Sequence, residues 1–120
     1  METEFSMLPW HDAELLGIEI DRHNPGECDQ ISMSIRWPSD VYSELIFSGC
    51  YELEIKMNFG VIASESILDA SLIQDSYELD SIRKRWRLVG VNLSELKCFE
   101  IRTNTTNSLI RIYALSYSIR

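Results

Sequence analysis

The stretch from residue 44 to residue 59, ELIFSGCYELEIKMNF, constrains the fold of this chain more than any other. Apolar and polar side chains alternate along it, a period of two that is typical of a β-strand with one face in a core. Gly49 has no side chain to place on either face, which predicts a bend or bulge between two segments. We therefore expect a long, half-buried strand around which the rest of the chain is arranged. Its apolar positions are Leu45, Phe47, Tyr51, Leu53, Ile55, Met57 and Phe59.

The residues before this stretch predict a hairpin. In 13–22 the even positions Leu16, Ile18 and Ile20 are apolar, and in 31–37 apolar residues alternate cleanly with polar ones. The segment between them, HNPGECD, carries the Asn-Pro-Gly signal of a turn. We expect two antiparallel strands, followed by the long stretch as the third and fourth segments of the same meander.

A second hairpin is predicted at the end of the sequence. Residues 98–103 alternate, TNTTNS from 103 to 108 reads as a turn, and 109–119 has apolar residues at both odd and even positions. The last pattern is typical of a strand covered on both faces. Residues 61–74 fit either a strand or a loose helix, and we favour the extended form.

One helix is predicted, from about Asp75 to Val89. Asp75 and Glu78 have the spacing of a capping pair, and Gly90 stands where a helix would end. Apolar residues recur at three- and four-residue steps, which predicts a core-facing stripe. The stripe comprises Leu79, Ile82, Trp86 and Val89, with Trp86 as an anchor in the core. Residues 1–9 lack a pattern and predict a loose end.

These elements predict one α+β domain over residues 1–120: a mainly antiparallel β-sheet of about six strands with one amphipathic helix packed on it. No run of apolar residues is long enough to span a bilayer, and the first residues are acidic, unlike a signal peptide. Three widely spaced cysteines without a CxxC pair indicate reduced thiols. We therefore expect a soluble, cytoplasmic protein that does not contact membranes.

Charge is unevenly distributed along the chain, whose net charge is -8. Residues 1–82 carry 17 acidic and three basic side chains, whereas residues 83–120 carry eight basic and two acidic ones. The acidic balance argues against a nucleic-acid partner, because phosphate binding needs clustered Lys and Arg. Either the two halves attract each other within one fold, or an acidic face binds a basic partner.

Two groups of residues are candidate sites. Trp10, His11, Asp12 and Trp37 are possible lining residues of a pocket, although we favour the simpler interpretation that Trp10 packs while His11 and Asp12 satisfy backbone groups at the start of a strand. Glu19, Asp21, Glu52 and Glu54 would form a partner-binding carboxylate ladder if their strands are neighbours. Such a ladder needs basic compensation, which a partner or the nearby Arg22, Arg36 and Lys56 would supply.

The sequence gives less support to a basic binding face, a metal site or a phosphate-binding loop. The basic residues Arg83, Lys84, Arg85 and Arg87 could bind an acidic partner, but basic helix faces are more often simply solvated. Histidines and cysteines lack the spacing of a metal site, and the glycines are isolated rather than gathered in a phosphate-binding loop. We therefore expect no metal, no cofactor and no catalytic residues.

The segments WHDAELLGIEID, LIFSGCYELEIKMNFGVI and IRTNTTNSLIRIYA together resemble a group of small bacterial proteins. That group opens with a Trp-His-Asp-Ala-like motif, and some members are similar to immunity proteins of polymorphic toxin systems. The resemblance implies a non-enzymatic protein-binding module that turns an acidic face toward a basic toxin. We expect a monomer or a homodimer. Two alternatives stay open: a small-ligand binder or enzyme with a pocket near His11, and a structural domain that self-associates through a sheet edge.

Overall fold

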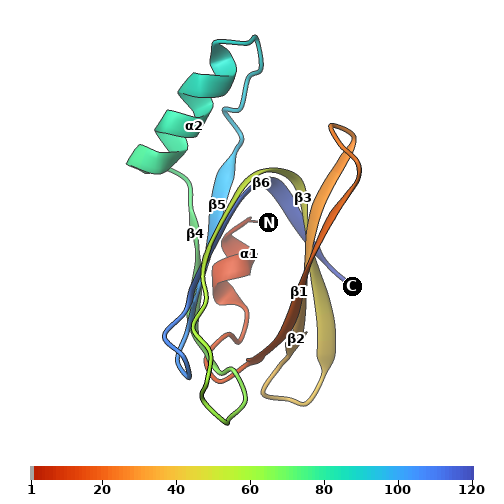
Figure 1. Cartoon of the computed structure of the whole chain (residues 1–120), viewed down its shortest axis with the longest axis vertical. Helices are drawn as coiled ribbons and strands as arrows, with labels where there is room; N and C mark the ends of the chain where they lie inside the picture. The colour runs from red at the N-terminus through yellow and green to blue at the C-terminus, as the bar shows by residue number, and fades with distance from the viewer. Residues whose placement is uncertain (1) are drawn as a thin grey trace.

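The computed structural model describes residues 2–120, apart from the side chains of residues 2, 3 and 28. Six antiparallel strands form one sheet in the order β1-β2-β3-β6-β5-β4, and two helices accompany it (Figure 1). This confirms the predicted α+β class and the six-stranded sheet, with one more helix than expected. The elements are α1 (Glu2–Met7), β1 (Glu14–Asn24), β2 (Cys28–Arg36), β3 (Tyr42–Lys56), β4 (Ile67–Ile73), α2 (Tyr77–Arg87), β5 (Lys97–Thr103) and β6 (Leu109–Ile119).

The sheet curls until its two edge strands meet at one end. There the amide of Asp12 donates to the carbonyl of Ile67 at 3.0 Å, and the amide of Ile67 donates to Ala13 at 2.7 Å. The amide of Leu15 adds a bond to Glu65 at 2.9 Å. These bonds join β1 to β4 and turn the sheet into a half-open barrel, whose concave side holds the main core (Figure 1).

Both predicted hairpins are present, as β1–β2 and β5–β6, and residues 67–73 are the strand β4. The long stretch at residues 44–59 largely forms the single strand β3, which pairs with β2 on one side and β6 on the other. It therefore continues the meander of the first hairpin as a third strand, as expected, but it is one bent strand rather than the expected third and fourth segments, and its far side pairs with the second hairpin.

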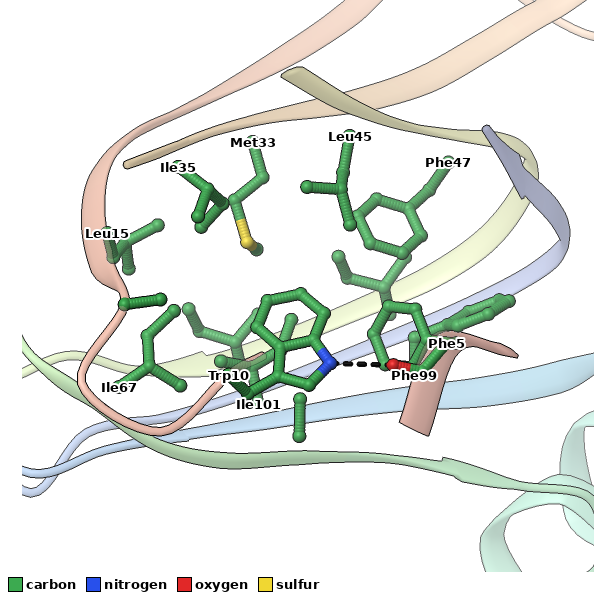
Figure 2. Packing of buried hydrophobic residues seen from close by; sticks show 14 of the residues in the cluster. Phe5, Trp10, Leu15, Met33, Ile35, Leu45, Phe47, Ile67, Phe99 and Ile101 are labelled. Carbon is green, nitrogen blue, oxygen red and sulfur yellow. Dashed lines mark hydrogen bonds between the residues drawn. The ribbon is translucent and has the colours of Figure 1, made fainter. Parts of the chain in front are cut away.

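Helix α1 fills the concave side of the sheet (Figure 1). Phe5 is fully buried, and its ring centroid lies 5.0 Å from that of Trp10 and 5.0 Å from that of Phe99. The indole N–H of Trp10 donates to the carbonyl of Phe5 at 2.6 Å, as Figure 2 shows. The prediction of a loose end is therefore wrong for residues 2–7. A helix this short is unstable alone, so tertiary packing of Phe5 holds it in place.

The start of β1 differs from the predicted alternation. The pairing with β2 shifts between Leu15 and Gly17, as at a β-bulge, so Leu15 and Ile18 pack with the core. Leu16 and Ile20, predicted on the same face as Ile18 by their even numbers, are 52% and 56% exposed. The bulge places Leu15 instead of Leu16 on the core face, whereas Ile18 and Ile20 keep the predicted face, opposite Met33 and Ile31, and Ile20 is exposed near the tip of the hairpin.

Helix α2 begins one residue later than predicted, because Ser76 rather than Asp75 is its N-cap. The Ser76 hydroxyl accepts from the amide of Leu79 at 3.1 Å. The predicted end is close to the observed one: the helix runs to Arg87, and Gly90 follows with φ 85°.

The core face of α2 is narrower than predicted. Leu79 and Ile82 are buried against Tyr113 in a second, smaller core. Trp86 is 36% exposed and Val89 70% exposed, so the prediction that Trp86 anchors the helix in the core is wrong. Figure 1 shows α2 rising beyond the upper end of the sheet, where its last turn has little sheet to pack against.

Candidate functional site

A cleft of about 480 Å³ opens between the tip of the β1–β2 hairpin, the middle of β3 and the last turns of α2. Four carboxylates and one guanidinium, that of Arg22, line it together with apolar side chains. We call it the acidic cleft. Its carboxylates belong to Asp21, Glu27, Asp29 and Glu52, and its apolar side chains include those of Ile20, Ile31, Tyr51, Leu53 and Trp86.

The hairpin tip that forms one wall is held in shape by Asp29. One carboxylate oxygen accepts from the Arg22 guanidinium at 2.8 Å, and the other accepts from the backbone amide of Gly26 at 3.1 Å. Gly26 has φ 86°, a conformation that few residues other than glycine adopt, so the turn depends on it. The wall is therefore a preformed structure.

A bulge in β3 forms the base of the cleft. Gly49 has φ 64°, and a Cβ atom added there would lie 2.9 Å from the Leu115 side chain on β6. The pairing with β6 then shifts between Cys50 and Glu52, so β3 carries one extra residue at this point. The bend predicted from Gly49 is present, and it directs Tyr51 and Glu52 toward α2.

Tyr51 and Trp86 form the aromatic part of the site. Their ring centroids are 5.0 Å apart with an interplanar angle of 80°, an edge-to-face arrangement. Trp10 and Trp37 are buried at 3% and 7% exposure, whereas Trp86 is 36% exposed. Trp86 is therefore the tryptophan that a ligand in the cleft would touch.

Hydrogen bonds keep two of the cleft carboxylates ionised. The backbone amide of His23 lowers the pKa of Asp21, and its ring nitrogen, 2.7 Å away, lowers it further. The amide of Gly26 lowers the pKa of Asp29, with a further contribution from Arg22. Donors that bind a carboxylate favour its charged form, so both groups carry full negative charge at neutral pH.

The predicted ladder of Glu19, Asp21, Glu52 and Glu54 does not form. Strand β2 lies between β1 and β3, so the two pairs of acids are on strands that are not neighbours. Glu54 instead pairs with Arg111 at 3.1 Å, and Glu52 with Arg85 at 3.1 Å.

Basic residues that were expected to neutralise the carboxylate ladder have other partners. Arg22 and Arg36, expected near the ladder, bind Asp29 and Glu14 instead. Of the four ladder residues, Asp21 and Glu52 line the acidic cleft and Glu19 and Glu54 do not.

The four residues of the pocket predicted near His11 lie in two different environments. Trp10 and Trp37 are buried, with ring centroids 5.1 Å apart, while the His11 and Asp12 side chains are 73% and 70% exposed. A ring nitrogen of His11 lies 3.3 Å from the carbonyl of Leu68. None of the four lines the acidic cleft.

A second cleft, of about 500 Å³, lies between α2 and the loop that leads to β5. Arg83, predicted on a solvated basic face, is only 14% exposed there. Its guanidinium donates to the carbonyls of Gln74 and Leu96, each at 2.8 Å, and pairs with Asp80 at 3.3 Å. These contacts fasten α2 to the sheet, so we assign this cleft a structural role.

Two thiols are free and largely withdrawn from solvent. Burial raises the pKa of Cys50 to about 11 and that of Cys98 to about 11. Both are therefore protonated at neutral pH and poor nucleophiles. The side chain of Cys28 lies outside the described part of the structure.

Among the side chains that the structure describes, no cluster of three His, Cys, Asp or Glu residues is placed to hold a metal ion. The helices described are also too short and polar to cross a membrane. No protein-family model matches the chain, and no curated protein matches it either. The resemblance described above therefore remains a prediction.

Most of the cleft is not evident from the sequence. Glu27 and Asp29 were placed in a turn, and Trp86 in the core. The sequence does contain one signal, because Gly49 indicates where β3 bends. The cleft draws its lining from the hairpin tip, β3 and α2, which are far apart in the sequence, so local patterns do not encode it.

Proposed function

We propose that this protein is a non-enzymatic protein-binding module whose acidic cleft receives a basic segment of a partner protein. The proposal depends on one observation: the cleft combines four carboxylates with the partly exposed ring of Trp86. Carboxylates attract Lys and Arg side chains, and an accessible indole face adds a cation–π contribution. An arginine on a loop or tail of the partner satisfies both conditions.

The carboxylates of the cleft differ in how far they are already paired. Asp29 holds Arg22, and Glu52 is bridged by Arg85 across the surface. Glu27 makes no ion pair in the described structure, and Asp21 binds only the neighbouring His23. Because exposed ion pairs are weak, an incoming guanidinium can compete for Glu52 as well as bind Glu27.

The charge of the whole chain supports the same kind of partner. Every lining residue of the cleft except Trp86 comes from positions 20–53, within the acidic part of the sequence. A net charge of -8 increases the rate at which a basic partner is encountered, most strongly at low salt. A basic toxin, which the sequence resemblance implies, is one partner of this class. Binding of that toxin would make the protein an immunity protein.

The test is a titration with a short arginine-rich peptide in which tryptophan fluorescence is the binding signal. Because Trp10 and Trp37 are buried, a change in emission reports mainly on Trp86. We expect a saturable change that weakens strongly when NaCl rises from about 50 mM to about 500 mM. The Trp86→Phe variant should lose the signal while keeping the fold.

A double charge reversal inside the cleft tests the proposal, and a double reversal outside the cleft is its control. Glu27→Lys combined with Glu52→Lys should weaken peptide binding about tenfold, since each rim charge contributes on the order of 0.5 to 1 kcal/mol. Two reversals outside the cleft, at the exposed Glu78 and Glu19, change the net charge equally. If the control pair weakens binding as much as the cleft pair, net charge rather than the cleft is responsible and the proposal is wrong.

A further inference from the structure

The outer edge of β1 is open beyond the point where it meets β4. At the end of this junction the amide of Leu15 donates to the carbonyl of Glu65 at 2.9 Å. Past it the two strands diverge, as Figure 1 shows, and no strand among the described residues lies along the outer side of β1. On the opposite edge, by contrast, the amide of Leu72 in β4 donates to the Ser6 hydroxyl of α1 at 3.0 Å. The edge of β1 therefore has room for another strand, and open edges are templates for pairing with another chain.

The alternation of backbone hydrogen bonds identifies the residues of β1 that face this open side. At the turn between β2 and β3, the amide of Trp37 donates to the carbonyl of Val41 at 2.9 Å. The odd-numbered residues of β2 therefore bond to β3 and its even-numbered residues to β1, where they meet odd-numbered positions from Gly17 to residue 21. It follows that Ile18 and Ile20 direct their N–H and C=O groups away from the sheet.

Two carboxylates flank the outward backbone groups of Ile20. Glu19 and Asp21 lie on the same face of β1, because successive side chains of a strand point to opposite faces. Ile20 and Asp21 also line the acidic cleft, so the open edge is the outer rim of that cleft. A strand added along this edge would bring its side chains opposite Glu19 and Asp21, where the facing Cα atoms are only about 4.5 Å apart.

A second copy of this chain does not fit the edge. Two copies related by a two-fold axis would pair antiparallel, with the outward residues of one opposite the outward residues of the other. If Ile20 pairs with its own copy, Glu19 lies opposite Asp21. If Ile20 pairs with Ile18, Glu19 lies opposite Glu19, and if it pairs with Arg22, Asp21 lies opposite Asp21. Like charges directly opposite each other destabilise a sheet, so the edge favours a basic strand over its own copy.

We propose that the basic segment received by the acidic cleft adds to the edge of β1 as an extra antiparallel strand, with Lys or Arg at two positions separated by one residue. This inference rests on the proposed function, because that segment is the ligand. Its middle residue exchanges backbone hydrogen bonds with Ile20, and its two basic side chains lie opposite Glu19 and Asp21. Main-chain bonds supply affinity in this mode of recognition, and the spacing of the side chains supplies specificity.

Methylation of the ligand's backbone tests the proposal without changing the protein. The probe is a peptide of about seven residues with arginine at its third and fifth positions and uncharged residues elsewhere, and fluorescence anisotropy measures its affinity. A methyl group on the backbone nitrogen of the fourth residue removes the donor to Ile20 and should weaken binding about tenfold. The same group on the nitrogen of the fifth residue points away from β1 and should change binding less than about twofold. A peptide of equal composition with adjacent arginines should bind about threefold more weakly, because only one of the two can face the acids.

Two measurements on the protein locate the added strand. With saturating peptide, the amides of Ile18 and Ile20 should exchange with solvent about tenfold more slowly, as followed by nuclear magnetic resonance. Glu19 lies on this edge but does not line the cleft, so Glu19→Lys alone should weaken binding about threefold, less than the double reversal inside the cleft. Its matched control is Glu78→Lys on α2, which makes the same charge change away from the edge and should alter binding less than about 1.5-fold.

The results that would overturn the inference also separate it from the proposed function. If both methylated peptides bind as the unmodified one does, the ligand does not add to β1, and the acidic cleft still binds a basic segment. If no arginine peptide binds, both the inference and the proposed function are wrong. Slow exchange of Ile18 and Ile20 that appears without peptide and increases with protein concentration would identify a second copy on the edge and contradict the inference.

Discussion

Replacing Phe5 by alanine tests whether α1 is an integral part of the core. The side chain is fully buried, and besides Trp10 and Phe99 its ring centroid lies 5.1 Å from Tyr117 and 6.1 Å from Phe47. Removal of a buried phenylalanine side chain costs roughly 3 to 5 kcal/mol, because apolar contact is lost and a cavity remains. With four aromatic neighbours that cannot all move into the gap, we expect a cost of about 4 kcal/mol.

The assay is equilibrium unfolding in urea, with far-ultraviolet circular dichroism as the signal. Met7→Ala is the matched control, since Met7 lies on the same helix but is 83% exposed, and its loss should change stability by less than about 0.5 kcal/mol. If Phe5→Ala also costs less than about 1 kcal/mol, then α1 does not fill the concave side of the sheet. That result would refute the description of the main core given above.

Three further predictions concern α2, the bulge in β3 and an ion pair. Trp86→Ala should lower the free energy of unfolding by about 1 kcal/mol, mostly because the ring contact with Tyr51 is lost. Ile82→Ala should lower it by about 2 kcal/mol or more, because Ile82 is buried; urea unfolding measures both. Gly49→Ala should cost more than about 1 kcal/mol, because alanine is strained at positive φ and its Cβ has no room; a neutral result would remove the bulge as a constraint. The hydrogen bond from Arg102 lowers the pKa of Asp69 below 3.8. The ionised Asp69 carboxylate therefore stabilises the fold above that pH, and this stabilisation is lost as the pH falls through the lowered pKa. Asp69→Asn should therefore reduce the loss of stability below about pH 4, as followed by thermal unfolding at several pH values, and an unchanged acid profile would contradict the assignment.

The regular elements could be predicted from sequence because their signals are local. Ile31, Met33 and Ile35 alternate without interruption, and all three are buried in β2. Gly49 marked the bend in β3 because a positive φ has few alternatives to glycine. Hairpin turns were likewise found from their Asn, Pro and Gly residues.

The remaining features depend on contacts between distant parts of the chain. Nothing near Phe5 in the sequence indicates the aromatic cluster that makes six residues helical. The bulge that exposes Leu16 changes the core-facing positions of β1 from odd at Leu15 to even at Ile18, and it is visible only in the pairing with β2. The predicted ladder assumed that the strands of Glu19 and Glu52 are neighbours, which the strand order excludes.

The acidic cleft depends most strongly on contacts between distant parts of the chain. Its walls come from the hairpin tip, β3 and α2, which are distant from one another in the sequence. Composition indicated an acidic protein and a basic partner, but it could not show which carboxylates meet Trp86. Sequence therefore indicated the acidic balance of the chain but not the position of the cleft.

A charge-swap titration tests the central claim most directly. Wild type and the double variant Glu27→Lys with Glu52→Lys are each titrated with an arginine-rich peptide and with the same peptide carrying glutamate in place of arginine. If the cleft recognises charge, the variant should bind the arginine peptide more weakly than wild type and the glutamate peptide more tightly. If the variant binds both peptides as wild type does, the acidic cleft is not the binding site.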